Sequence, residues 1–154
     1  MIATARSVLD TGVIVEYIDL RGEYHDLARA VVDSILRGRI EAIVPHPVVA
    51  ETHYVSARIY RRLGLDDWAE RADKLVRWLC SIPTVAIKGE DLALAIEASR
   101  VKLEYGLALT DCYVLAASEI YGGRPIFRER EAEMLSKIDA LEEEFSVVFL
   151  EDYK

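Results

Sequence analysis

The stretch SVLDTGVI at residues 7–14 decides how this chain folds. A short apolar run ends at Asp10, and apolar residues between positions 13 and 18 then continue at the spacing of a buried helix. We therefore predict a strand followed at once by a helix, with Asp10 at the junction. Asp10 also suits the N-cap of that helix, where its carboxylate would accept a hydrogen bond from the backbone N–H of Gly12 or Val13.

Strands and helices alternate along the rest of the chain. The apolar periodicity predicts helices over residues 24–36, 48–63, 66–81, 91–105 and 107–120, strands over 40–44, 84–87, 125–127 and 147–150, and an acidic helix or turn over 129–143. Gly38 and Gly106 follow two of these helices, at the position where glycine commonly ends a helix. This alternation predicts a three-layer α/β/α domain with a mostly parallel central sheet of about five strands.

The length and composition indicate a single globular domain over residues 1–154. The chain has 154 residues, of which 52% are hydrophobic and 30% charged, so it can bury a core and is neither disordered nor fibrous. We find no apolar stretch that suits a signal peptide or approaches the ~18 residues of a membrane span. We therefore expect a soluble, cytoplasmic protein without a membrane partner.

The formal net charge of −8 disfavours a nucleic-acid-binding domain that contacts the phosphate backbone through a basic surface. The same charge is compatible with an enzyme that gathers carboxylates around divalent metal ions, because the ions reverse the local field. Cys80 and Cys112 lie far apart within apolar runs. We expect both to be buried thiols, since their spacing matches neither a disulfide framework nor a metal knuckle.

Three acids lie where predicted strands lead into helices. Asp10 follows the first strand, Glu51 lies in the helix after the second, and Asp111 begins the apolar helix over 107–120. In open α/β sheets, working sites form at this carboxyl edge of the strands. Asp10 as an N-cap and Asp111 as a partner of the helix dipole also have purely structural interpretations.

Glu51 and Asp111 share an unusually apolar setting. Glu51 falls on the helical stripe of Val48 and Val55, and the neighbours of Asp111 offer no basic residue within a turn. A buried carboxylate is costly unless it is neutralised, paired or bound to a cation. A hard divalent ion would meet this need, and Mg²⁺ or Mn²⁺ suits an all-oxygen ligand set better than Zn²⁺ does.

Three segments together resemble the PIN-domain family, in particular the VapC-type toxin ribonucleases. They are SVLDTGVI at 7–14, PVVAET at 47–52 and LTDCYVLAA at 109–117, and they keep the order and spacing of the family over essentially the whole chain. The resemblance implies a Mg²⁺- or Mn²⁺-dependent endoribonuclease. It also implies that Asp10, Glu51 and Asp111 are the catalytic metal ligands.

The fourth acid of the family falls in the segment IFREREAEM at residues 126–134. Members often carry a Thr-x-Asp stretch there, which this chain lacks. Matching Met134 to the usual Phe of the family makes Glu131 the fourth catalytic and metal-binding acid, with Glu129 as the second choice. The longer Glu side chain in place of Asp is expected to shift or weaken a second metal.

The implied reaction is hydrolysis of an RNA phosphodiester by water, which needs no side-chain nucleophile. In agreement, the chain has no G-x-S-x-G motif and no paired Cys and His. Contacts to the substrate would come from cations around the opening of the proposed acidic site. The candidates are Arg58, Arg61, Arg62, Arg124, Arg128 and Arg130. Arg128 and Arg130 are the preferred substrate-binding pair because they adjoin the fourth acid.

The resemblance further implies an RNA substrate, a cognate antitoxin protein and a homodimer. Two alternatives stay open: a PIN-like scaffold that binds RNA or protein with weak or no catalysis, and a housekeeping RNA-processing nuclease. Other enzyme classes fit less well. A haloacid-dehalogenase phosphatase needs an acid where Gly12 stands, and the first turn lacks the G-x-G-x-x-G of dinucleotide binding.

Overall fold

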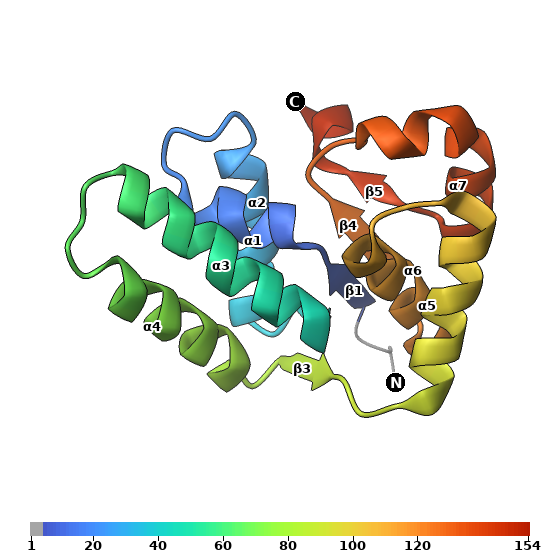
Figure 1. Cartoon of the computed structure of the whole chain (residues 1–154), viewed down its shortest axis with the longest axis horizontal. Helices are drawn as coiled ribbons and strands as arrows, with labels where there is room; N and C mark the ends of the chain where they lie inside the picture. Colours follow the sequence, from blue (N-terminus) through green and yellow to red (C-terminus); the bar gives the residue numbers. More distant parts are fainter. Residues whose placement is uncertain (1–4) are drawn as a thin grey trace.

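The computed structural model describes residues 5–154 and contains one five-stranded sheet in the order β3-β2-β1-β4-β5 (Figure 1). The strands are β1 (Ala5–Leu9), β2 (Ile40–Pro45), β3 (Val85–Lys88), β4 (Arg124–Phe127) and β5 (Val148–Phe149). All their pairings are parallel. Residues 1–4 of the predicted domain lie outside the described range.

Helices cover both sides of this sheet. In Figure 1, α1 (Thr11–Ile18), α2 (His25–Leu36), α3 (His46–Arg62) and α4 (Trp68–Ser81) gather on one side of β1. On the other side lie α5 (Leu92–Tyr105), α6 (Leu109–Tyr121) and α7 (Ile138–Phe145). The predicted three-layer α/β/α architecture with a parallel sheet is confirmed.

Helix α6 forms the interior of the layer that it shares with α5. Its residues Cys112 and Val114 are fully buried, as the nearly uniform apolar sequence predicts. It begins at Leu109, two residues later than expected, because Gly106 ends α5 with a φ of 70° and the chain then turns back through Leu107 and Ala108. This turn delivers Asp111 to the first turn of α6.

The predicted acidic segment over 129–143 is divided in two. A 3-10 helix, η1 (Ala132–Lys137), precedes α7, and a second one, η2 (Leu150–Tyr153), follows β5. The division lets each piece bury its own apolar residues, which are Met134 in η1 and Leu141 and Phe145 in α7. The strand expected over 147–150 is shorter, because β5 spans only Val148–Phe149.

The expectation that both cysteines are buried is wrong for one of them. Cys112 is buried, and this burial raises the pKa of its thiol to about 11. Cys80 is exposed near the end of α4, because Leu79 takes the inward position and the next residue is rotated by about 100° around the helix. No helix among residues 5–154 combines the length and the hydropathy that crossing a lipid bilayer requires.

Candidate active site

Asp10 lies at the point where β1 passes into α1. It is the N-cap of α1, and its Oδ2 accepts a hydrogen bond of 3.1 Å from the backbone N–H of Gly12. The side chain is buried, and its other oxygen, Oδ1, has no hydrogen-bond partner among the described residues. The capping role and a ligand role are therefore compatible, since one oxygen caps the helix and the other is free to bind a cation.

Asp111 occupies the first turn of α6 with 8% of its surface exposed. Among residues 5–154 we find no ion pair for its carboxylate. The nearest segments are apolar, as Leu107 and Cys112 are both fully buried. The carboxylate thus sits in a setting that penalises its charge without compensating for it.

These two acids face the same cavity as the other acids predicted from the sequence. Its volume is about 360 Å³. The residues that line it come from α1, α3, the start of α6 and the chain after β4; they are Asp10, Thr11, Gly12, Val15, Glu51, Val55, Ala108, Asp111, Arg128, Glu131, Ala132 and Glu133. The fold therefore brings together Asp10, Glu51, Asp111 and Glu131, which lie far apart in the sequence.

The electrostatics of the cavity reflect this crowding. Burial is the largest cause that raises the pKa of Asp10 to about 7. The hydrogen bond from Gly12 opposes this shift, and the charge of Glu51 adds to it. Burial, together with the charges of Asp10, Glu131 and Glu51, raises the pKa of Asp111 to about 8. Neighbouring negative charges thus make Asp10 and Asp111 harder to ionise, as expected of carboxylates that bind a cation or hold a proton.

Glu131 and Glu129 differ in their surroundings. Glu131 lines the cavity, and burial raises its pKa while Arg128 opposes that shift. Glu129 does not line the cavity and pairs with the guanidinium of Arg128 at 3.2 Å. Between these two acids, the geometry favours Glu131.

Glu133 is a cavity residue that the sequence analysis missed. It lines the same hollow, and its Oε2 accepts a hydrogen bond of 3.1 Å from the backbone N–H of Ala108. This bond ties η1 to the turn before α6. The only signal in the sequence was a third acid in the alternating run of residues 129–133, where alternation alone does not say which acids face inward.

The two preferred cations behave differently. Arg128 lines the cavity, and its guanidinium lies 3.6 Å from Glu16 and 3.2 Å from Glu129. Arg130 points away from the cavity into a cluster of carboxylates from α7 and η2, with pairs at 2.7 Å to Glu142 and 2.8 Å to Glu151. The geometry thus favours a structural role for Arg130.

Arg130 is held by further contacts, and Arg61 and Arg124 are also engaged elsewhere. Arg130 pairs with Asp152 at 2.8 Å and lies over the ring of Phe149. Arg61 lies over the ring of Trp68, and Arg124 donates to the carbonyl of Ser146. None of the three lines the acidic cavity.

The cavity residues fit a divalent cation by their chemistry. The donors are all carboxylate oxygens, and Asp10 Oδ1 is a buried oxygen that lacks a partner. Such a donor set suits Mg²⁺ or Mn²⁺. In the described conformation, no three His, Cys, Asp or Glu side chains of residues 5–154 already form a metal-ligand cluster.

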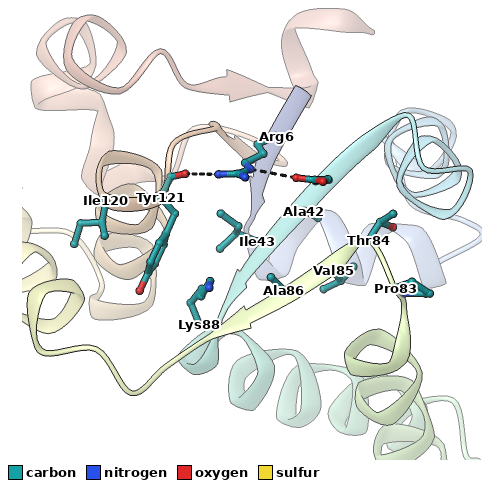
Figure 2. Close-up of a pocket in the computed structure, with 11 residues that line it drawn as sticks. Arg6, Ala42, Ile43, Pro83, Thr84, Val85, Ala86, Lys88, Ile120 and Tyr121 are labelled. Atoms are coloured by element: carbon teal, nitrogen blue, oxygen red, sulfur yellow. Dashed lines mark hydrogen bonds and ion pairs between the residues drawn. The ribbon is translucent and has the colours of Figure 1, made fainter. Parts of the chain in front are cut away.

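A larger cavity of about 530 Å³ lies elsewhere, between β2, β3 and the end of α6 (Figure 2). Figure 2 shows Arg6 at its rim, with hydrogen bonds to the carbonyl of Tyr121 and to the carboxylate of Glu41. The acid here is already neutralised by its partner. The smaller acidic cavity is therefore the better candidate for catalysis.

A family model described as PIN domain matches residues 7–141 of the chain. The chain belongs to the PIN-domain family. This finding confirms the resemblance seen in the three acidic segments. No match to this PIN domain was found among curated proteins.

Several solved structures share the fold of this PIN domain at low sequence identity. A toxin–antitoxin complex from Klebsiella pneumoniae is 16% identical, with 85% of this chain and 92% of that chain covered and a TM-score of 0.58. VapBC2 from Rickettsia felis, bound to a DNA fragment from its promoter, is 10% identical, with 94% and 96% covered and a TM-score of 0.62. VapC20 from Mycobacterium tuberculosis, a toxin that cleaves the sarcin-ricin loop, is 14% identical, with 84% and 93% covered and a TM-score of 0.62.

Proposed function

We propose that this PIN domain is a Mg²⁺- or Mn²⁺-dependent endoribonuclease and the toxin of a toxin–antitoxin pair, acting in the cytoplasm. The observation that carries the proposal is the pair of buried carboxylates, Asp10 and Asp111, which face one cavity without a cationic partner among the described residues. A soluble fold retains such an arrangement only at a cost in stability. A cation that neutralises both acids removes that cost and prepares the site for a phosphate.

In this proposal, Asp10, Glu51 and Asp111 would hold the divalent ion, and Glu131, which lines the same cavity, would complete the ligand set. A bound ion would supply Lewis acidity and would lower the pKa of a water molecule toward neutral pH. Glu131 would accept the proton of the attacking water through the carboxylate oxygen that is not bound to the ion, since it lines the same cavity. Arg128 binds the phosphate whose bond is broken, since it lines the same cavity.

The proposed partners are an RNA substrate, a cognate antitoxin and a second copy of the chain. The Klebsiella structure is a toxin–antitoxin complex, and the Mycobacterium protein is a toxin that cleaves the sarcin-ricin loop. A homodimer is supported by an apolar ridge on α5, where Leu92, Ile96 and Leu103 are 77%, 61% and 86% exposed. Large exposed apolar side chains grouped on one helix face are typical of an interface.

A PIN-like scaffold is the competing function. The observation in its favour is that, among residues 5–154, the acids do not already form a metal-ligand cluster. A scaffold would bind RNA or protein without needing a metal. The two functions therefore differ in whether a carboxylate-dependent metal site exists.

The test combines metal binding with cleavage. Calorimetry with Mn²⁺ should give a binding isotherm for the parent chain and a large loss of affinity for Glu51→Gln. RNA cleavage in Mg²⁺ or Mn²⁺ should fall at least about 100-fold in Asp10→Asn and Asp111→Asn, since a catalytic metal contributes several kcal/mol.

Circular dichroism of each variant serves as the control for folding. Equal cleavage by the parent and both Asn variants would contradict the proposal. So would folded parent protein that shows no Mn²⁺ binding dependent on Glu51, and this second result would favour the scaffold.

A further inference from the structure

A groove continues from the candidate active site between α1 and α3. A second hollow of about 290 Å³ is lined by Val15, Glu16, Asp19, Val55, Arg58, Ile59, Arg62 and Arg128. Three of these residues, Val15, Val55 and Arg128, also line the acidic cavity. The two hollows therefore share walls, and Arg128 stands at their junction.

One face of α3 forms a wall of both hollows. Glu51, Val55, Arg58 and Arg62 follow at intervals of four, three and four residues. On an ideal helix these intervals keep the four side chains within about 60° of arc. The helical rise sets Arg58 about 10 Å and Arg62 about 16 Å beyond Glu51 along the axis. The same face thus carries the acid at one end and two cations at the other.

The cations of the groove are available to a ligand. Among residues 5–154 we find no ion pair or side-chain hydrogen bond for Arg58 or Arg62, and both are exposed. The two acids in the groove are already engaged. Glu16 accepts from the backbone N–H of Tyr24 at 2.8 Å and faces Arg128, while Asp19 accepts from the backbone N–H of Arg21 at 3.1 Å. Three arginines against two acids give the residues that line this hollow a formal charge of +1.

We propose that this groove binds the phosphates of a single RNA strand that enters the acidic cavity, with Arg58 and Arg62 as its phosphate contacts. The proposal rests on the ribonuclease function proposed above and adds the path of the substrate. A chain with a net charge of −8 and a cluster of acids at its centre repels a polyanion. A row of free cations that leads to the cluster supplies the attraction that the site itself lacks.

The path implies that the strand extends beyond the cleaved bond on one side. Arg58 and Arg62 lie roughly 10–16 Å from Glu51 along α3, so they contact nucleotides outside the acidic cavity. Arg130 is held by α7 and η2 and lies outside both hollows. The strand therefore runs along α3 and not toward α7.

The test measures RNA binding without cleavage. The probe is a fluorescein-labelled single-stranded RNA of mixed sequence and about 20 nucleotides, longer than single-strand sites of about 4–16 nucleotides. Anisotropy is recorded in EDTA on the Asp111→Asn chain, with and without Arg58→Gln and Arg62→Gln. The double Gln variant should bind at least about tenfold more weakly, and the slope of log K against log salt should fall by about 1.4.

Arg61→Gln is the matched control. Arg61 belongs to the same helix and has the same charge, but it lies over the ring of Trp68 and outside both hollows. Its removal should change the affinity by less than about twofold, because it makes no phosphate contact on this path. Circular dichroism and thermal unfolding verify that each variant is folded.

The outcomes separate this inference from the proposed function. An unchanged affinity and salt slope in the folded double variant overturn the groove, even if the parent cleaves RNA. Unchanged RNA binding combined with lost binding of poly-L-glutamate also overturns it, and makes the groove a protein site. Weakened RNA binding supports the groove, even if the parent chain shows no metal-dependent cleavage and the nuclease proposal fails.

Discussion

At the scale of single residues, the decisive feature is that Asp10 and Asp111 are kept where their charge is unfavourable. Burial and mutual repulsion raise their pKa values to about 7 and about 8. The unfolded chain has no such environment, so its aspartates ionise near the ordinary value of about 3.9. The difference links the protonation of these residues to the stability of the fold.

This linkage between protonation and stability leads to a testable prediction. Between about pH 4 and pH 8 the folded protein retains protons that the unfolded chain releases, so the free energy of unfolding falls as the pH rises through the raised pKa values. Asp111→Asn removes an ionisable group and should flatten this fall. Near pH 8 we expect the variant to be more stable by at least about 1 kcal/mol, which is about 2–4 °C in Tm.

Thermal unfolding in EDTA at several pH values provides the measurement. The comparison is the difference between parent and Asp111→Asn, because the other titrating groups are common to both. Parallel curves from pH 4 to pH 8 would show that Asp111 ionises as freely in the folded chain as in the unfolded one.

At the scale of secondary-structure elements, the chain after β4 is organised by Arg130. Its guanidinium joins Glu142 of α7 to Glu151 and Asp152 of η2, and it also covers the ring of Phe149. These contacts fix α7 and η2 against the end of the sheet. They also restrain η1, which directly precedes α7 and packs against it, and which follows Glu131 and carries Glu133 to the cavity.

The prediction at this scale is that Arg130 stabilises the fold and does not bind substrate. Arg130→Gln leaves three carboxylates close together without their cation, and should lower the unfolding free energy by about 1–2 kcal/mol, since partly exposed partners are screened by water. Arg130→Lys should recover only part of this loss, because an ammonium cannot make forked pairs.

Chemical denaturation and RNA anisotropy measure the two effects separately. Arg128→Gln provides the comparison, with weaker RNA binding expected at a smaller cost in stability. A stable Arg130→Gln protein with lost RNA affinity would restore the substrate role that the sequence indicated.

The elements themselves could be predicted largely from local patterns. Gly38 and Gly106 adopt φ values of 75° and 70°, as expected of residues that end helices, and Pro45 ends β2 one residue beyond the predicted limit. These features depend on neighbours in the sequence. Apolar periodicity likewise reports which face of a helix is buried, so the interior position of α6 followed from its composition.

The features that could not be predicted from the sequence depend on contacts between segments that are far apart in the sequence. Nothing near Arg130 in the sequence shows that Glu142 and Asp152 fold back onto it. The role of Glu133 depends on the backbone N–H of Ala108, which is 25 residues away. Asp10, Glu51 and Asp111 could be grouped in advance only because the carboxyl ends of parallel strands meet at one edge and because the family resemblance supports that grouping.

At the scale of the whole molecule, the outer surface of α5 is as notable as the cavity. Leu92, Ile96 and Leu103 fall within about 40° of arc on an ideal helix and are largely exposed. In Figure 1 this helix lies at the outside of its layer, away from the sheet. In Figure 1, α3 with Arg58 and Arg62 lies on the opposite side of β1 from α5, so a second copy bound to α5 would leave the proposed RNA path open.

We predict that a charge on this ridge disrupts self-association. Leu103→Glu should shift the protein toward the monomer by at least about tenfold in dimer dissociation constant, because burying an unpaired carboxylate costs more than about 1.4 kcal/mol. Sedimentation velocity over a range of concentrations provides the measurement.

Leu20→Glu is the control for this variant, since Leu20 is 80% exposed and lies outside α5. It should associate like the parent chain. A parent that stays monomeric at every concentration, or equal association of both Glu variants, would remove α5 as the interface.

The four proposed metal ligands are spread from residue 10 to residue 131, and this spacing has a consequence for biosynthesis. A ribosome releases Asp10 first, and Glu131 emerges after the other three. If the chain cuts RNA, the nascent polypeptide is inactive until Glu131 has left the ribosome, because its set of metal ligands is incomplete before then.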